Sequence, residues 1–147
     1  MEKIKKTVSA TEEDQVSRKL LAWLNTFPNK PVDLIRFEAL PADTAAMALS
    51  TIQAAYIVKK YILGGYQAEY QFKIIYRISP GNSTDLRLQA DELLNALGDW
   101  ATGKHPDIGD GKRVITLEPT TRSSLFAMYD NGDEDHQILM KLTYEVI

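Results

Sequence analysis

Residues 67–78 read Gln-Ala-Glu-Tyr-Gln-Phe-Lys-Ile-Ile-Tyr-Arg-Ile, and this stretch decides the fold class. Apolar side chains occupy every second position, and polar side chains fill the positions between them, with Ile75 as the only break. Successive side chains of a β-strand point to opposite faces, so the pattern predicts a strand with one buried and one solvated face. This strand is long against a usual length of about 5–6 residues.

Two other segments repeat apolar residues at helical spacing. The first helix is expected to begin at Thr11, which can cap it, and to end before Pro28. Its buried stripe contains Val16, Leu20, Trp23, Leu24 and Phe27. The second helix is expected after the polar break at residues 80–84 and is closed by Gly103. Its stripe contains Leu86, Ala90, Leu93, Leu94, Leu97 and Trp100.

Shorter strands are expected at residues 32–40, 56–63, 114–118, 125–129 and 138–147. Residues 47–53 suit a strand, although their alanines leave a helix open. The simplest packing is an α+β fold, with one mostly antiparallel or mixed sheet of about six strands and two amphipathic helices packed on one face. We expect one domain over residues 10–147, preceded by a flexible basic N-terminal arm over residues 1–9.

The composition excludes several kinds of chemistry. The 147-residue chain has no cysteine, so disulfides, zinc–thiolate sites and thiol nucleophiles are excluded. Its two histidines, His105 and His136, share no ligand spacing, and we expect no metal and no cofactor. A net charge of −3 gives no general reason to bind nucleic acid or an anionic membrane. The sequence shows no secretory signal and no apolar run of about 20 residues, which predicts a soluble protein made in the cytoplasm.

Three motifs resemble functional sites and are better interpreted as structure. The acidic residues of 130–135 lack the glycine and glutamate positions of a calcium loop, so we expect a solvated hairpin tip. Gly64-Gly65 lacks the rest of a phosphate loop and predicts a tight turn. His105 beside Asp107 and Asp110 could serve as a general base, but no nucleophile can be placed against it.

The remaining aromatic residues and His136 are interpreted from their positions in the expected strands and turns. His136 begins the last expected strand and is predicted to be a surface or edge residue. Tyr61 and Tyr66 flank the glycine turn and are candidates for an interface. The aromatic residues of 70–76 fall on the face opposite to the basic residues, so an aromatic RNA-binding platform is not favoured.

The order of elements and two motifs resemble a known family. The motifs are the Tyr61-Ile62-Leu63-Gly64-Gly65-Tyr66 turn and the second helix's ending, Leu97-Gly98-Asp99-Trp100. With them the chain resembles, over most of residues 10–147, the tail-terminator or minor capsid family of bacteriophages and prophage-like particles of Gram-positive bacteria. The motifs are structural, and the resemblance implies no catalytic, cofactor-binding or metal-binding residue.

The resemblance implies a hexameric ring that caps the tail tube, stops its polymerisation and docks to the head connector or collar. Expected partners are further copies of the chain, the tail tube, sheath proteins and, in a complete phage, the head connector. The expected location is a virion or phage-tail-like particle assembled in the bacterial cytoplasm, and a phage is not separated from a headless bacteriocin. A neck or head-completion adaptor and a small enzyme that uses His105 are the alternatives.

The interface is expected at the glycine-rich loop 103–112 and at the glycine turn. Its candidate residues are Gly103, Lys104, His105, Asp107, Asp110, Lys112, Tyr61 and Tyr66. Ile108 is the only large apolar side chain of that loop, so we expect the loop to become ordered against a neighbouring subunit or the tail tube.

Overall fold

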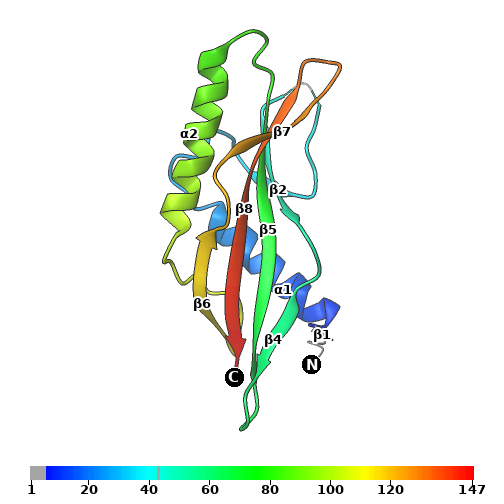
Figure 1. The fold of residues 1–147 in the computed structure, drawn as a ribbon, viewed down its shortest axis with the longest axis vertical. Coiled ribbons are helices and arrows are strands. Elements are labelled where there is room, and N and C mark those ends of the chain that lie inside the picture. Colours follow the sequence, from blue (N-terminus) through cyan, green and yellow to red (C-terminus); the bar gives the residue numbers. More distant parts are fainter. Residues whose placement is uncertain (1–5, 43) are drawn as a thin grey trace.

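The structure, a computed structural model, describes residues 6–42 and 44–147 and contains one sheet with two helices (Figure 1). In chain order the elements are β1 (Lys6–Thr7), α1 (Ala10–Leu24), β2 (Ile35–Phe37), β3 (Ala46–Thr51), β4 (Tyr56–Lys60), β5 (Tyr66–Ile78), α2 (Thr84–Ala101), β6 (Lys112–Pro119), β7 (Ser124–Met128) and β8 (Glu134–Val146). Among the described residues, neither helix is long and apolar enough to cross a membrane.

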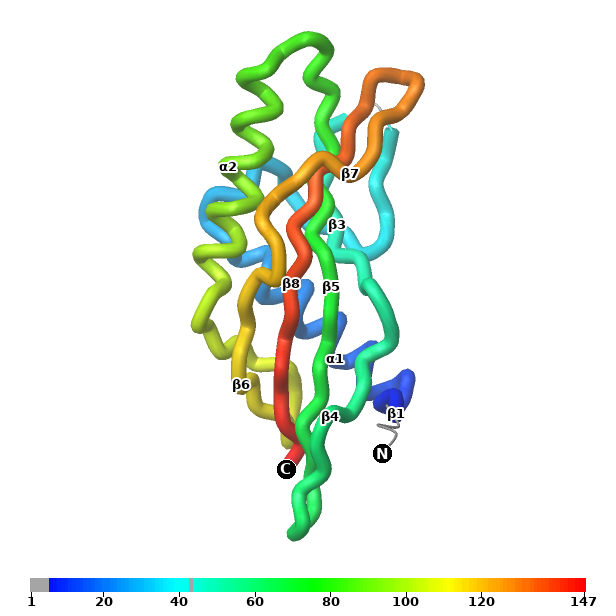
Figure 2. Tube along the Cα trace, viewed as in Figure 1, coloured from blue at the N-terminus to red at the C-terminus, as the bar shows by residue number. Residues whose placement is uncertain are grey.

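Strands β5 and β8 form the central pair of the sheet. Each has 13 residues, and they run antiparallel in register from Tyr66 opposite Val146 to Ile78 opposite Glu134. Figure 2 shows the two strands side by side along the length of the molecule. The predicted alternation is confirmed in β5, where Ala68, Tyr70, Phe72 and Ile74 are fully buried.

Each flank of the central pair is shared by two short strands. On one flank, β4 pairs with the beginning of β5 and β3 with its later part. On the other flank, β7 pairs with the beginning of β8 and β6 with its end. Strand β1 extends the sheet beyond β4, and β2 joins β3 as the one parallel pair among the described strands. This tandem pairing produces an eight-stranded sheet.

The expected sheet of about six strands with two helices packed on one face is therefore wrong. The sheet has eight strands and is almost entirely antiparallel. Helix α1 crosses the sheet obliquely, and α2 stands along the side formed by β6 (Figure 1). Hydrophobic alternation describes one strand at a time, so it shows neither that two strands share one flank nor which edge a helix covers.

The core lies between the helices and the buried face of the central pair. Helix α1 contributes Val16, Leu20 and Leu24, all fully buried, and β8 contributes Met140 and Leu142. The stacked rings of Trp23 and Trp100 join the two helices, with their centroids 4.5 Å apart.

The helix boundaries follow from their caps. Ser9, and not Thr11, caps α1, because its hydroxyl accepts a hydrogen bond from the Glu12 amide at 3.1 Å. Ser83 caps α2 by accepting from the Leu86 amide at 3.2 Å. Near the end of α2, a Cβ on Gly98 would lie 2.8 Å from Ile138 Cδ1, so the glycine lets the helix approach β8 closely.

Part of the expected N-terminal arm lies in the sheet. Lys6 and Thr7 pair with β4, and Val8 is 8% exposed. Residues 1–5 of the expected arm lie outside the described residues.

Candidate interaction surfaces

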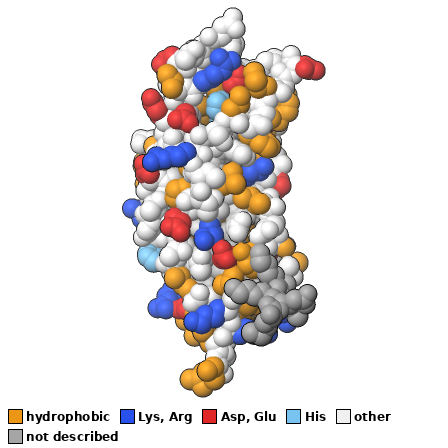
Figure 3. Space-filling view, viewed as in Figure 1, with side chains coloured by type: hydrophobic (Ala, Val, Ile, Leu, Met, Phe, Trp, Pro, Cys, Tyr) orange, Lys and Arg blue, Asp and Glu red, His pale blue; other side chains and the backbone are white. Residues whose placement is uncertain are grey.

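A projecting hairpin forms one end of the molecule. Residues 61–66, here called the finger, comprise the turn between β4 and β5 and the first residue of β5, and they extend beyond the rest of the sheet (Figure 1). At its tip, Ile62 and Leu63 are 102% and 100% exposed. Figure 3 shows this tip as a hydrophobic cluster standing clear of the rest of the surface. The finger is therefore an apolar projection.

The base of the finger is fixed by tyrosine hydroxyl groups. Tyr61 donates to a Glu145 carboxylate oxygen at 2.7 Å and accepts from the side-chain amide of Gln67 at 2.9 Å. Tyr66 donates to Glu12 of α1. Burial, together with the hydrogen bond to that carboxylate, raises the pKa of Tyr66 to about 12. Both tyrosines therefore hold the base by polar contacts and leave the tip exposed.

Both glycines of the turn have a left-handed backbone, and only one is crowded. The φ angles of Gly64 and Gly65 are 100° and 84°. A Cβ on Gly65 would overlap the Val146 carbonyl oxygen, whereas a Cβ on Gly64 would meet open space. The expected tight turn is confirmed, and Gly65 also lets the turn pass close to the end of β8.

We expect Gly65→Ala to destabilise the protein more than Gly64→Ala. Each alanine costs about 1 kcal/mol for its left-handed backbone. The overlap at Gly65 adds about 2 kcal/mol, because backbone atoms must move. Urea denaturation of both variants measures the difference. Equal losses in the free energy of unfolding would show that the close approach to Val146 does not affect stability.

The glycine-rich loop is attached to its own chain. Ile108 is 1% exposed and belongs to the core, while Lys104 and Asp110 are exposed. The Gly103 amide donates to the Leu117 carbonyl at 3.2 Å, and an Asp107 carboxylate oxygen accepts from the Gly109 amide at 2.9 Å. Ile108 thus anchors the loop without help from a neighbour.

The predicted interface residues are brought together only in part. Lys112 and Tyr66 lie on either side of Val146 in the sheet, so both belong to the finger end of the molecule, where Tyr61 also lies. His105 is engaged elsewhere, since its Nδ1 lies 3.0 Å from the Val114 carbonyl oxygen. Because neither this contact nor that of Asp107 joins the histidine to a carboxylate, the general-base interpretation gains no support.

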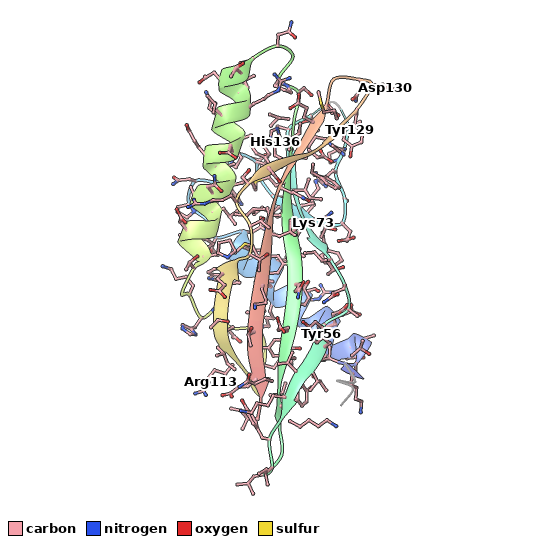
Figure 4. All side chains as sticks on the ribbon, in the orientation of Figure 1. Tyr56, Lys73, Arg113, Tyr129, Asp130 and His136 are labelled. Carbon is pink, nitrogen blue, oxygen red and sulfur yellow. The ribbon has the colours of Figure 1, made fainter. Side chains whose placement is uncertain are left out.

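Sequence reasoning missed a buried ionic cluster at the opposite end of the sheet. The residues Asp133, Glu134, Asp135 and His136 are 2–5% exposed. Arg77 donates to the two Asp135 carboxylate oxygens at 2.7 and 2.9 Å, and Arg87 reaches Glu134 at 2.6 Å. Figure 4 shows His136 in this part of the molecule, below the exposed Asp130.

Two expectations are corrected by this cluster. Residues 133–135 are not part of a solvated tip, and His136 is not a surface residue, because β8 already begins at Glu134 and pairs there with β5 and β7. The partners Arg77 and Arg87 make the burial of carboxylates tolerable. The sequence carried no such signal, because residues 133–137 are all polar and the apolar alternation of the last strand begins only at Ile138. Within the described residues, no group of three or more histidine and carboxylate side chains is arranged to hold a metal ion.

Acid should remove the stability that Glu134 supplies. The hydrogen bond from Arg87 is the largest effect on Glu134 and lowers the pKa of its carboxyl below the ordinary 4.5. A lowered folded-state pKa means that this stability is present above about pH 4.5 and is lost as the pH falls through the folded value. We therefore expect Glu134→Gln to lower the melting temperature at pH 6 and to converge with the parent towards pH 3. A pH-independent difference would contradict this linkage.

An apolar groove lies between the start of α2 and the end of β5. It has a volume of about 420 Å³, and its apolar lining includes Pro31, Tyr76, Ile78, Leu86, Ala90 and Leu93. Leu86 belongs to the predicted buried stripe of α2 but is 43% exposed. The first turns of α2 therefore carry apolar side chains that the sheet covers only partly. This α2 groove is the second candidate interaction surface.

The fold over the described residues is mostly antiparallel β, with eight strands in one sheet and two helices. The same fold occurs in a solved chain from the virion of a native gene transfer agent particle. The TM-score is 0.55 with 16% sequence identity, and the match covers 95% of this chain and 99% of that chain. A second solved chain reaches a TM-score of only 0.46 with 19% identity, over 95% of this chain and 96% of that chain. No family model matches the sequence, and no curated protein matches it.

Proposed function

We propose that the chain is a structural component of a phage-like particle. The main support is that its fold, over 95% of the chain, is shared with nearly all of a chain from a gene transfer agent virion. A shared fold does not by itself imply a shared role. The proposal therefore also relies on the two motifs that resemble tail terminators and on the two apolar surfaces, the finger tip and the α2 groove.

Within such a particle, the role we propose is tail terminator. The chain forms a ring, with six copies as the proposed number, that caps the tail tube, stops its polymerisation and docks to the head connector or collar. Gly65 and Gly98 occupy the two resemblance motifs, and both stand where a side chain would meet another element. These motifs thus fix the attachment of the finger and of α2, the two elements that carry the candidate surfaces.

The particle itself provides the test of this role. Electron micrographs of particles made without this gene should show tails of irregular length, and the purified protein should bind to tube ends. Light scattering of the purified protein at high concentration should show a hexamer-sized species. A strict monomer that also fails to bind tail tubes would rule out the role. Binding only at the head side of the neck would instead favour an adaptor.

Weak binding to nucleic acid is a further expectation. The chain has a net charge of −3, and basic residues such as Arg77 and Arg87 are engaged with carboxylates. Duplex DNA should therefore bind no tighter than about 10⁻⁶ M at physiological salt, the tight end of the usual non-specific range. A fluorescence anisotropy titration measures this, and a tighter, sequence-dependent complex would point to a nucleic-acid-binding module.

A further inference from the structure

The apolar tip of the finger has no function within its own chain. Positive φ angles at Gly64 and Gly65 provide for the turn, and Tyr61 and Tyr66 hold its base. Ile62 and Leu63 contribute no burial, since both are fully exposed. Turn positions are usually polar, and apolar side chains gathered on a projection mark a contact site. The tip therefore requires a recipient outside the chain.

The α2 groove has the complementary property. Its wall is apolar where Leu86, Ala90 and Leu93 of α2 face Tyr76 and Ile78 of β5, and it is open to solvent. A groove of this kind accepts branched aliphatic side chains, as helix-lined apolar grooves generally do. The finger presents two such side chains.

The segment that carries the tip and the helix that lines the groove have opposite charge balances. Residues 56–66 contain Lys59 and Lys60 and no acidic residue. Helix α2 contains four carboxylates, Asp85, Asp91, Glu92 and Asp99, against one basic residue, Arg87, which is engaged with Glu134. Glu92 itself lines the groove. Lys59 and Lys60 beside the apolar tip are thus opposite in charge to Glu92 at the groove and to the acidic balance of α2, which favours docking and sets its orientation.

We infer that the finger of one copy inserts Ile62 and Leu63 into the α2 groove of a second copy. A chain cannot fill its own groove, because the finger and the groove lie at opposite ends of the 13-residue strand β5 (Figure 1). Each copy offers both halves of the contact, so the association is heterologous, and it closes into a ring when the rotation between copies permits. The inference deepens the proposed function by naming the contact between ring subunits, and it rests on that function only for ring closure.

Paired substitutions in the full chain test the contact. Ile62→Ser with Leu63→Ser should weaken self-association in sedimentation experiments by about tenfold or more, because central apolar anchors dominate an interface. The melting temperature should not change, since neither side chain is buried. Ala96→Arg, which fills the groove from an exposed helix position, should have the same effect. Leu88→Ser is the matched control, because Leu88 is 53% exposed on α2 and does not line the groove.

Disulfide trapping tests which surface of the second copy the finger contacts. The chain has no cysteine, so no native thiol competes with the introduced ones. Leu63→Cys mixed with Gln89→Cys or Ala96→Cys should give a covalent dimer on oxidation, since a disulfide forms only between Cα atoms within about 7 Å. Leu63→Cys mixed with Asp130→Cys is the control, because Asp130 lies on a different hairpin (Figure 4).

Three results would overturn the inference: a parent chain that stays monomeric at all concentrations, tip variants that associate like the parent, or Leu63→Cys linked only to itself. The proposed function is tested separately, by whether the parent protein binds to the ends of tail tubes. If the parent and its tip variants cap tubes and associate equally well, the proposed function stands and this contact is ruled out. A parent that never binds tubes would lose the function, while the trapping experiment still decides the contact.

Discussion

Replacing Phe72 with aspartate should lower the free energy of unfolding by about 4 kcal/mol or more. Phe72 is fully buried in the middle of β5, opposite Met140 of β8 and 5.7 Å from the Tyr70 ring. The substitution removes a large apolar side chain, which alone costs about 3–5 kcal/mol, and it places a carboxylate within the apolar core. The loss is comparable with the whole stability of an ordinary domain, about 5–15 kcal/mol. We therefore expect a largely unfolded protein.

The neighbouring position provides the control for this prediction. Gln71 lies on the other face of β5, is half-buried, and stands opposite Lys141 of β8. Gln71→Asp should change the free energy of unfolding by about 0.5 kcal/mol, the usual range for surface substitutions. Urea denaturation at 25 °C measures both variants. Similar losses at the two positions would mean that the strand has no distinct buried face, and the account of the central pair would fail.

Arg77→Ala should cost about 3 kcal/mol, the second largest effect. The side chain of Asp135 is 2% exposed, and both of its carboxylate oxygens accept hydrogen bonds from Arg77. Those hydrogen bonds are the largest reason that the pKa of Arg77 is raised. Removing the arginine leaves a buried carboxylate without its cation, although the Tyr129 hydroxyl still donates to it at 2.8 Å. Breaking one partner of a buried ion pair is costly for this reason.

A double variant distinguishes the net stabilisation by the Arg77–Asp135 ion pair from the cost of leaving the buried Asp135 carboxylate without its cation. Arg77→Met combined with Asp135→Leu removes both charges and keeps side-chain volume, and such replacements are often neutral. We expect the double variant to regain most of the stability lost in Arg77→Ala, as measured by thermal and urea unfolding. A double variant as unstable as Arg77→Ala would show that the specific hydrogen bonds, including the one from Arg77 to the Leu40 carbonyl, carry the effect.

Much of the central architecture was predictable from local pattern. The alternation in residues 67–78 identified the buried face of β5, and helical spacing identified Val16, Leu20 and Leu24 as core residues. The glycine pair predicted the turn that forms the finger. The candidate interaction surfaces were less predictable from the sequence than the core. Tyr61 and Tyr66 pointed to the finger, whereas nothing in the local pattern indicates that Ile62 and Leu63 at its tip are exposed.

The elements that escaped prediction depend on partners that are far apart in the chain. Leu86 was assigned to the buried stripe of α2 because its spacing fits, but whether a stripe residue is covered depends on how far the sheet extends beside the helix. The same limit applies to β1, whose two residues gain their identity only by pairing with Ile57 and Tyr56.

The sequence by itself determined which side chains share a face, because the 2.0 and 3.6 periodicities are properties of the local backbone. It also determined the absence of thiol chemistry and the positions of the turns. Only the tertiary structure decided that two short strands share each flank of the β5–β8 pair and that Asp135 is buried against Arg77, 58 residues away. It also decided that the finger and the α2 groove face solvent at opposite ends. The physical reason is that register, ion-pair burial and exposure are set by contacts between distant segments, and local periodicity carries no record of those contacts.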